Sequence, residues 1–563
     1  MIVSCIAVLL RLCCGLFGYS GKGTPPMFGD FEAQRHWLEI TANTKMTEWY
    51  VETPQNDLLY WGLDYPPLTA YVSYMYGKLA QHIYPPLVVL HESRGHESPL
   101  GKVFMRLSVL FLDCLIMFPA IRKIAKLLST NGLSSAEDAN SSASSSTTLA
   151  AAVASFHPHT YSFDSRVLLT LLAPALILID YGHFQYNCVC IGLTLLGLYF
   201  IVDDGKGTYK KGDLLGSFFF CMALNFKQMT LYYAPVFFFS LLRKCHSVSR
   251  LPGTNIISLH FDGVKHLFAI GMTVIGSFAG LWLPFCIPFV NIEYCLESMG
   301  HILKRIFPFH RGIFEDKVAN LWYLSSVIFD YRDVLHVETI IKLALVLTLI
   351  LILPVAIDLL KKPITIERGL LALVNSALAF FLASYQVHEK SLLLALIPAA
   401  LLSGEEPMMI AWFQVVGTFS MYPLLLRDGL VVPYFAMVIM YLVMSNMIYT
   451  ISTETSTAVN VPSATDARRK VYGGQSLLWL HVKKCIVGLS IFGMVLLHIG
   501  YAFISPPAKL PDLFPALFAL YSSCNLVFCY IYFVTWQYTL GEFRDARGND
   551  GNRSPTSARK KRD

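Results

Sequence analysis

The sequence has little charge for its length. Of its 563 residues, 15% are Asp, Glu, Lys or Arg, compared with about 25% in typical soluble proteins. A soluble chain of this length would form several globular domains, and these charges are too few to cover their surfaces. The net charge of +6 is modest. The basic residues lie in short loops between apolar runs, so they do not predict a nucleic-acid-binding face.

Several motifs of soluble proteins are also missing. The 13 cysteines include no Cys-x-x-Cys pair and no zinc spacing, so we expect neither a zinc site nor a disulfide framework. The sequence contains no Gly-rich phosphate loop and no dinucleotide-binding fingerprint. No soluble domain for a nucleotide sugar could fit between the apolar segments. An activated sugar, if the protein uses one, would therefore have to be attached to a lipid.

What the sequence does contain is long apolar runs, and 55% of its residues are hydrophobic. A bilayer core is spanned by about 20 apolar residues. The sequence thus predicts an all-α polytopic membrane protein. Some runs are shorter than a full span and must be tilted, re-entrant or sheltered by their neighbours. About fourteen spans are expected, near 2–19, 104–121, 165–181, 188–203, 214–226, 229–242, 267–290, 339–360, 368–386, 391–403, 408–426, 431–451, 485–503 and 512–538.

The short basic loops predict the orientation of these spans. Lys and Arg residues follow the second, fourth, sixth and eighth spans and precede the thirteenth, which predicts that this side is cytosolic. Both termini are then cytosolic, and two large segments, 20–103 and 291–338, face the other side. The C-terminal pair Lys560-Lys561 resembles a retrieval signal of endoplasmic-reticulum membrane proteins, with a solvated basic tail as the alternative.

Polar residues cluster mainly at the ends of spans on the non-cytosolic side. A transporter would instead place its ionisable residues within spans. Clusters at span ends could converge on one site at the membrane surface. Such a site suits an enzyme whose lipid-borne substrate keeps its tail in the bilayer while its head group reacts in water.

Three acidic residues stand out in the first large segment. Asp30 and Glu32 follow the first span closely and could provide a general base or hold a divalent metal. A surface acidic pair or a helix N-cap is the structural alternative. Asp64 precedes two prolines and is expected in an extended turn, where it could also cap the next helix.

Four basic positions could meet an anionic head group. Lys227 interrupts the apolar stretch 214–242, which favours two short helices over one span that would bury the ammonium in lipid. Arg305 opens a run of cations and aromatic residues suited to phosphate and sugar, or to an amphipathic surface helix. His388 and Lys390 lie at a junction of two spans and could bind a lipid phosphate, although a structural histidine is the alternative.

Taken together, five motifs resemble the dolichyl-phosphate-glucose-dependent α-1,3-glucosyltransferases of the endoplasmic reticulum. The resemblance covers nearly the whole chain and is greatest to the members that add the first glucose to the nine-mannose lipid-linked oligosaccharide. Around Arg35 and through 311–320 the sequence follows the first-glucose pattern. The motifs are Phe28–Trp37, Trp61–Ala70, Gly182–Asn187, Arg311–Asn320 and Gln386–Lys390.

The resemblance implies a GT-C glycosyltransferase fold with two large lumenal loops. It also implies inverting transfer of glucose from dolichyl phosphate glucose to a dolichol-diphosphate-linked acceptor, without a cofactor or a metal. By family analogy Asp30 is the general base and His388 lies near the donor phosphate. We further expect a set of substrate-binding residues, for which the roles of Asp64, Lys227, Arg305 and Lys390 are our own inference. The set is Glu32, Arg35, Asp64, His183, Lys227, Arg305, His388 and Lys390.

On this basis the chain divides into six parts. They are the first spans with the lumenal catalytic loop 20–103 (1–131), a cytosolic linker with a possible insertion (132–166), a transmembrane module (167–290), a second lumenal loop (291–338), a C-terminal transmembrane module (339–541) and a cytosolic basic tail (542–563). Three alternatives remain open: the sister enzyme that adds the second glucose, a transporter of lipid-linked sugars, and a structural subunit of a glycosylation complex.

Overall fold

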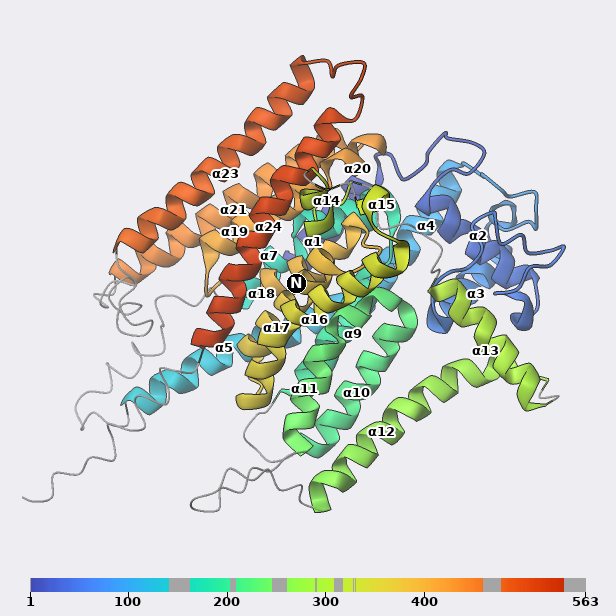
Figure 1. The fold of residues 1–563 in the computed structure, drawn as a ribbon, viewed down its shortest axis with the longest axis horizontal. Coiled ribbons are helices and arrows are strands. Elements are labelled where there is room, and N and C mark those ends of the chain that lie inside the picture. The colour runs from blue at the N-terminus through green and yellow to red at the C-terminus, as the bar shows by residue number, and fades with distance from the viewer. Residues whose placement is uncertain are drawn as a thin grey trace, which may run out of the picture.

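The fold is helical throughout the described residues in a computed structural model of the chain (Figure 1). The described residues are 2–140, 163–202, 209–245, 261–288, 291–307, 317–327, 329, 331–458 and 477–540. Within them no strand forms, and Thr53 and Asn56 make an isolated bridge. Most of the linker 132–166, part of the motif 311–320 and the tail 542–563 lie outside these residues.

The helices follow one another with few long connections. The α-helices are α1 (Ile2–Gly15), α2 (Asp30–Asn43), α3 (Pro67–Ile83), α4 (Pro99–Leu112), α5 (Phe118–Asn140), α7 (Phe163–Leu171), α8 (Pro174–Ile177), α9 (Asn187–Ile201), α10 (Tyr209–Phe226), α11 (Ala234–Cys245), α12 (Phe261–Trp282), α13 (Ile292–Ile306), α14 (Leu321–Ser326), α15 (Tyr331–Val334), α16 (Val337–Lys361), α17 (Ile366–Ala383), α18 (Leu393–Leu401), α19 (Pro407–Ser420), α20 (Tyr422–Arg427), α21 (Val431–Ala458), α23 (Leu477–Phe503) and α24 (Leu513–Thr539). Short 3-10 segments are η1 (Met46–Glu48), η2 (Pro85–Leu87), η5 (Gln228–Tyr233), η6 (Leu283–Cys286) and η7 (Glu389–Leu392), and π-helical segments are η3 (Asp113–Met117) and η4 (Leu178–Phe184).

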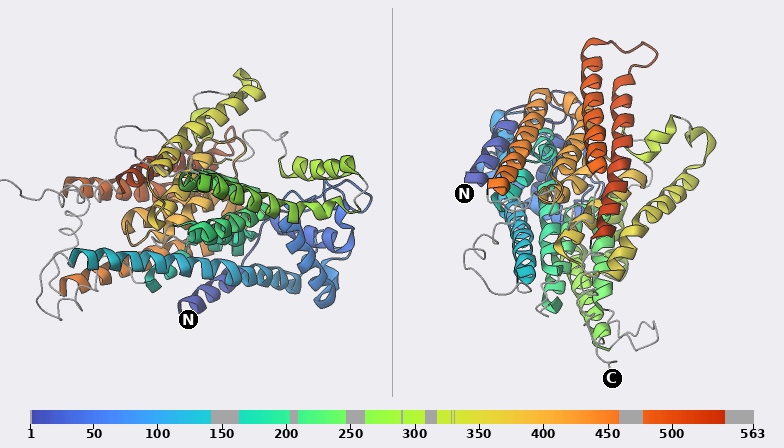
Figure 2. Two further views of the ribbon diagram at one scale, coloured as in Figure 1. Left: turned by 90° about the horizontal axis from the view of Figure 1, so that it is seen from below. Right: turned by 90° about the vertical axis from the view of Figure 1, so that its left-hand side faces the viewer.

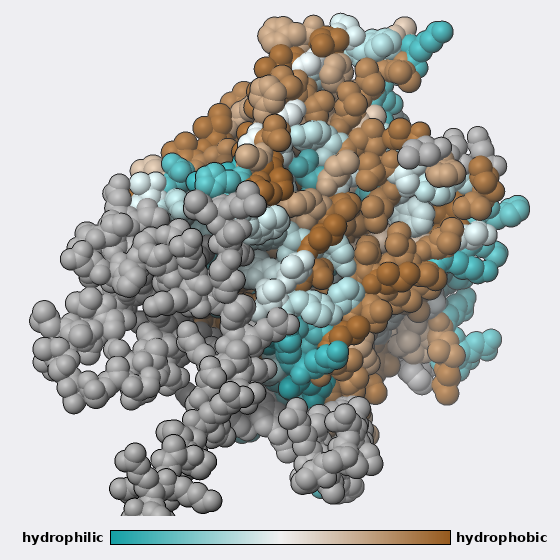
Figure 3. Space-filling view, turned by 60° about the vertical axis from the view of Figure 1, so that its left-hand side comes forward, coloured by the Kyte–Doolittle hydropathy of each residue, from teal (hydrophilic) through white to brown (hydrophobic). Residues whose placement is uncertain are grey.

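Seven of the described helices are long and apolar enough to cross a membrane. They are Pro99–Ser129, Gly263–Cys286, Val337–Lys361, Ile366–Ala383, Val431–Ile451, Trp479–Phe503 and Leu513–Thr539. The pair Phe163–Leu171 and Pro174–Phe184, bent by 44°, adds an eighth if it is one span. The chain is therefore a multi-pass membrane protein, and the fourteen spans remain a prediction. Apolar residues cover much of the face drawn in Figure 3, as a lipid-facing surface requires.

Helices shorter than a bilayer core are sheltered by their neighbours. A helix of 15 residues such as α9 is about 22 Å long, whereas the hydrocarbon core is about 30 Å thick. Almost every side chain of α9 is buried against other helices. The hairpin of α23 and α24 extends beyond the rest of the bundle, as the right-hand view of Figure 2 shows.

The first helix carries a charge into the bundle. Arg11 on α1 is fully buried and pairs with Asp113 of η3 at 2.6 Å. The same carboxylate accepts a hydrogen bond from the Tyr181 hydroxyl at 2.7 Å. The arginine that interrupts the first apolar run therefore has its partner on another helix of the bundle.

The predicted break at Lys227 is confirmed. Helix α10 ends at Phe226, Lys227 has an extended backbone (φ −147°, ψ 120°), and η5 begins at Gln228. The Thr69 hydroxyl of α3 donates a hydrogen bond to the freed carbonyl of Phe226. The break thus holds the end of α10 against the first large loop.

The two large loop segments pack on each other through a small core of their own. Trp37, Tyr50 and Leu63 of the first loop meet Ile302 and Ile306 of α13 in this core. In Figure 1 the blue helices α2 to α4 and the yellow-green α13 lie together at one side of the bundle. One disulfide, Cys286–Cys295, links η6 to α13. The cysteine spacing did not predict this bond.

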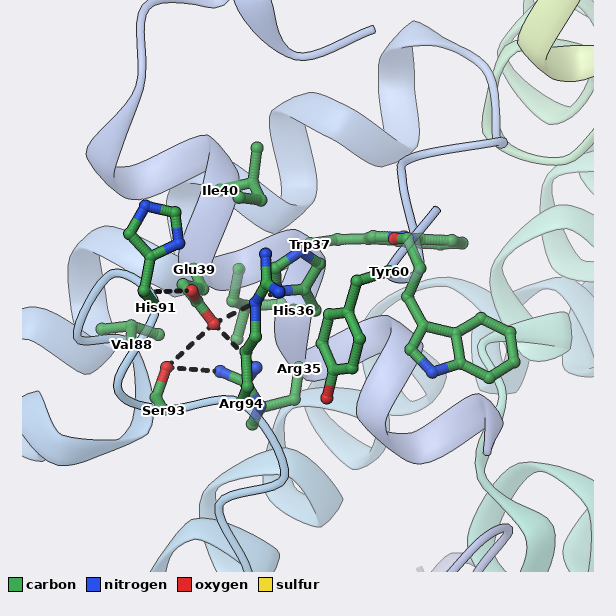
Figure 4. Close-up of polar contacts among 12 residues, drawn as sticks. Arg35, His36, Trp37, Glu39, Ile40, Tyr60, Val88, His91, Ser93 and Arg94 are labelled. Carbon is green, nitrogen blue, oxygen red and sulfur yellow. Dashed lines mark hydrogen bonds and ion pairs between the residues drawn. The ribbon is translucent and has the colours of Figure 1, made fainter. Parts of the chain in front are cut away.

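A buried ion network fixes α2 within the first loop (Figure 4). The Arg35 guanidinium donates to Glu32 and to Glu39 at 2.7 Å, and to Ser93 at 2.7 Å. Burial alone would raise the pKa of Glu39, but hydrogen bonds from His36 and Arg35 lower it to about 2. The backbone amide of His91 donates to the second Glu39 oxygen at 2.8 Å.

We predict that Arg35→Met destabilises this loop by about 3–5 kcal/mol, because two buried carboxylates would lose their counterion. Thermal unfolding of the detergent-solubilised protein measures the loss. Arg94→Met is the matched control. Arg94 is 30% exposed and pairs with Asp57 at 3.4 Å, so its loss should cost about 1 kcal/mol. Equal effects of the two substitutions would contradict the structural role of Arg35.

Candidate active site

Asp30 is the first residue of α2, and two chain segments hold it in place. Its backbone amide donates to the Ser20 hydroxyl at 3.1 Å, and the Ser20 amide donates to the carbonyl of His183 at 3.0 Å. Glycines allow this close approach. Gly21 has a φ of +74°, and a Cβ there would lie 2.0 Å from the nitrogen of Gly29. The start of α2 is thereby fastened to η4.

The carboxylate of Asp30 meets residues from two distant parts of the chain. Its Oδ2 lies 3.0 Å from His183 Nε2 and also accepts from the Gln185 side-chain amide and the Lys390 ammonium. Lys390 Nζ lies 3.2 Å from His183 Nε2. The Asp30 side chain remains 24% exposed. A substrate can therefore reach it.

The surroundings of Asp30 favour its charged form. Burial alone would raise the pKa of Asp30, but the positive charges of Lys390 and His183 and their hydrogen bonds hold it well below its usual range. Burial alone would likewise lower the pKa of Lys390, but Asp30 beside it raises that pKa. The two groups form an ion pair at neutral pH.

Further polar residues hold His183 and Gln185 in place beside Asp30. His183 Nδ1 lies 2.6 Å from Asp428 Oδ2, so the imidazole bridges two carboxylates. Lys227 donates to the side-chain oxygens of Gln185 at 3.0 Å and Asn187 at 2.7 Å, and lies 5.0 Å from the centre of the Tyr65 ring. Lys227 is thus buried in protein and is connected to Asp30 through Gln185, which bonds to both residues.

The sequence analysis missed Asp428 and gave no role of its own to Gln185. Gln185 lies in the quoted motif Gly182–Asn187. Asp428 lies in Arg427-Asp428-Gly429, just after an apolar run. Its place two positions beyond the predicted span 408–426 was the available signal, since an ionisable residue at a span is expected to have a partner.

Other predicted residues lie around this centre without bonding to Asp30 in the described structure. Glu32 and Arg35 belong to the buried network of α2 and form an ion pair with each other there. Arg305 donates to the carbonyls of Gly62 at 2.7 Å and Leu63 at 3.3 Å. It fastens α13 to the loop that carries Asp64.

The remaining two predicted residues are near neighbours in sequence of residues at the site: Asp64 precedes Tyr65, and His388 lies two positions before Lys390. The Asp64 carbonyl accepts from the Gln228 side chain at 3.2 Å. His388 immediately precedes η7, is half-buried, and stands two residues before Lys390. The structure therefore gathers Asp30, His183, Lys227 and Lys390 into one centre, with His388 on the segment that supplies Lys390.

The arrangement separates the two carboxylates that could have shared a metal. Asp30 Oδ2 faces Lys390, whereas Glu32 faces Arg35. Among the described residues, no three His, Cys, Asp or Glu side chains are grouped to hold a metal ion. Asp30 offers a group that can accept a proton, and Lys390 one that can bind an anion, which is the pairing needed when a hydroxyl attacks a phosphorylated carbon.

Comparison with known proteins is consistent with this chemistry. The ALG6, ALG8 glycosyltransferase family matches residues 4–533. This chain belongs to that family. Three relatives illustrate the similarity, and each aligns with at least 95% of this chain. A Mus musculus dolichyl pyrophosphate Man9GlcNAc2 alpha-1,3-glucosyltransferase is 40% identical over 548 residues, which is 96% of this chain and 98% of the relative.

The other two relatives come from distant organisms. A probable enzyme of the same name from Dictyostelium discoideum is 37% identical over 541 residues, covering 95% of this chain and 94% of the relative. The Saccharomyces cerevisiae enzyme of that name is 34% identical over 555 residues, covering 95% of this chain and 90% of the relative. The family resemblance inferred from the motifs is confirmed.

We predict that Lys390→Met raises the pKa of Asp30, because the substitution removes the nearest positive charge. Infrared difference spectroscopy across a pH titration detects the carboxyl band, with Asp30→Asn as the reference that identifies it. Lys78→Met is the control, since Lys78 bonds to Ala42 and Gln81. An unchanged Asp30 titration in Lys390→Met would show that the ion pair does not set the pKa.

Proposed function

We propose that this protein transfers glucose from dolichyl phosphate glucose to the terminal mannose of the nine-mannose lipid-linked oligosaccharide, forming an α-1,3 linkage for protein N-glycosylation. The observation that carries the proposal is the pairing of Asp30 with Lys390 and His183 at the start of the first large loop. The relatives named for this acceptor, at 34–40% identity over nearly the full chain, support the first-glucose step over the second.

In this reaction Asp30 is the general base. It removes the proton from the 3-hydroxyl of the mannose, and the hydroxyl oxygen forms a bond to the anomeric carbon of glucose. The bond between that carbon and the phosphate oxygen breaks, and dolichyl phosphate leaves with the electron pair. Attack from the face opposite the phosphate converts the β-linked donor into an α-linked product. The phosphate is a good leaving group, so the protein need not supply an acid.

Lys390 couples binding of the donor to activation of the base. In the described structure its ammonium is paired with Asp30, which makes the carboxylate a weak proton acceptor. A phosphate bound beside Lys390 and His388 competes for that ammonium. Once Lys390 turns to the phosphate, the pKa of Asp30 rises and the carboxylate becomes a stronger base. His183 and Asp428 keep the carboxylate aimed at the acceptor throughout.

The remaining predicted residues frame the substrates. Lys227 fixes Gln185 through a direct hydrogen bond and adds positive charge beside the donor phosphate. Arg305 fixes the loop around Asp64, which we place at the entrance for the sugar groups. Glu32 and Arg35 act on substrate binding through the position of α2, because both are buried.

We further propose that the protein lies in the endoplasmic reticulum membrane and has a GT-C architecture with about fourteen spans. Its active site is lumenal and both of its termini are cytosolic. The division into six parts given above belongs to this proposal. The Cys286–Cys295 disulfide supports the lumenal placement of the second loop, since such bonds persist in oxidising compartments. The basic loops on the opposite ends of the spans support the same orientation.

We predict that Asp30→Asn lowers glucose transfer by about 10²–10⁴-fold, the contribution typical of a positioned general base. The amide is similar in size, so the variant should fold. Radiolabelled transfer by the purified protein measures the rate. Asp57→Asn is the matched control on the same loop, because that carboxylate is 42% exposed and pairs only loosely, at 3.4 Å, with Arg94. Full activity of Asp30→Asn would remove Asp30 from the role of base.

A second experiment tests donor, acceptor and metal together. The purified protein is given dolichyl phosphate glucose and either the unglucosylated acceptor or one that already carries one glucose, each with and without a chelator. We expect transfer to the unglucosylated acceptor alone, at a rate that the chelator leaves unchanged. Preferred use of the monoglucosylated acceptor would identify the second-glucose enzyme, and flux of lipid-linked sugar without transfer would identify a transporter.

A further inference from the structure

A separate cavity lies beside the candidate active site. Its volume is about 790 Å³. Its walls come from α14, α20, the end of α23 and the start of α24, together with Lys317 before α14, Glu389 of η7 and the connection between α23 and α24. Two of its lining residues are chain neighbours of the catalytic centre. Glu389 directly precedes Lys390, and Arg427 directly precedes Asp428. The cavity is therefore next to the site, because Lys390 bonds to Asp30 and Asp428 bonds to His183.

Aromatic rings form much of the cavity wall. Six of them line it: Tyr323, Tyr422, Tyr501, Phe503, Phe514 and Phe518. The rings of Tyr501 and Phe514 lie edge to face at 5.5 Å, and those of Tyr422 and Phe518 are stacked at 5.2 Å. Tyr501 is 36% exposed, so a ligand can reach its ring. Exposed aromatic faces beside polar groups are suited to the apolar faces of sugar rings.

The charges of the lining cancel. Lys317 and Arg427 are opposed by Glu389 and Asp512, and Lys317 pairs with Asp512 at 2.8 Å. A phosphate would meet two carboxylates here, and a hydrocarbon chain would desolvate four charged groups without replacing their hydrogen bonds. A neutral ligand with many hydroxyls can bond to both signs of charge. The lining thus favours a carbohydrate over a lipid phosphate or a lipid tail.

We propose that this cavity binds mannose residues of the acceptor glycan that precede the reacting terminal mannose. The inference rests on the proposed function and names the acceptor subsite of that same reaction. A cavity of this volume lies within the range that holds small organic ligands, about 300–1,000 Å³, which is room for a short oligosaccharide. Tyr501 supplies a stacking face, and Arg427 and Glu389 bond to hydroxyl groups.

The test separates the two substrates kinetically. Tyr501→Ala should raise the KM for the lipid-linked nine-mannose acceptor about tenfold, the loss expected for one aromatic contact of about 1.4 kcal/mol. The KM for dolichyl phosphate glucose should not change. Tyr501→Phe keeps the ring and should keep the acceptor KM. Tyr449→Ala is the control for loss of an exposed tyrosine on a neighbouring span, since Tyr449 is 50% exposed and does not line the cavity.

Arg427→Gln provides a second variant in case Tyr501→Ala unfolds, and it too should raise the acceptor KM alone. An unchanged acceptor KM in a folded variant would overturn the cavity assignment while leaving the proposed reaction intact. A rise in the donor KM instead would assign the cavity to the donor and overturn the inference. Absence of transfer by the wild-type protein would overturn the proposed function itself.

Discussion

The contact between Asp30 and Lys390 joins residues 360 positions apart in the chain. Each partner is held by a different unit: Asp30 by the first turn of α2, and Lys390 by η7 between two helices of the bundle. The site therefore exists only while the first loop sits on the bundle in one orientation. Much of the rest of the structure can be understood as serving that orientation.

Three kinds of interaction maintain the orientation of the first loop on the bundle. The Arg35 network closes the first loop on itself, and the small core around Trp37 closes it on α13. Backbone bonds from Ser20 then attach the loop to η4, a π-helical turn that also carries Asp180 and His183. Wide helical turns of this kind are common at functional sites because they redirect side chains without ending the helix.

The sequence allowed a large part of this arrangement to be predicted. Long apolar runs indicated a membrane protein, and a lysine within one run indicated the break at Lys227. Motif resemblance indicated Asp30 and His183, and the place of Lys390 at a junction of two predicted spans indicated an anion-binding residue. The sequence could not show which charged residues bond to each other: Glu32 stands two residues from Asp30 but faces Arg35 instead of the site. Asp428 meets His183 from 245 positions away, a contact that no local pattern encodes. The Cys286–Cys295 disulfide spans only nine positions, but its spacing is not one that predicts a bonded pair.

The fully buried pair of Arg11 and Asp113 has a consequence for how the protein is made. A lone arginine at the centre of a helix costs about 2.5–3.5 kcal/mol to place in lipid, and α1 has only 14 residues to offset that cost. The counter-charge is synthesised about a hundred residues later. The buried position of Arg11 is therefore stabilised only after the helix Pro99–Ser129, which carries Asp113, has been synthesised, so that the amino-terminal region is assembled from both segments together.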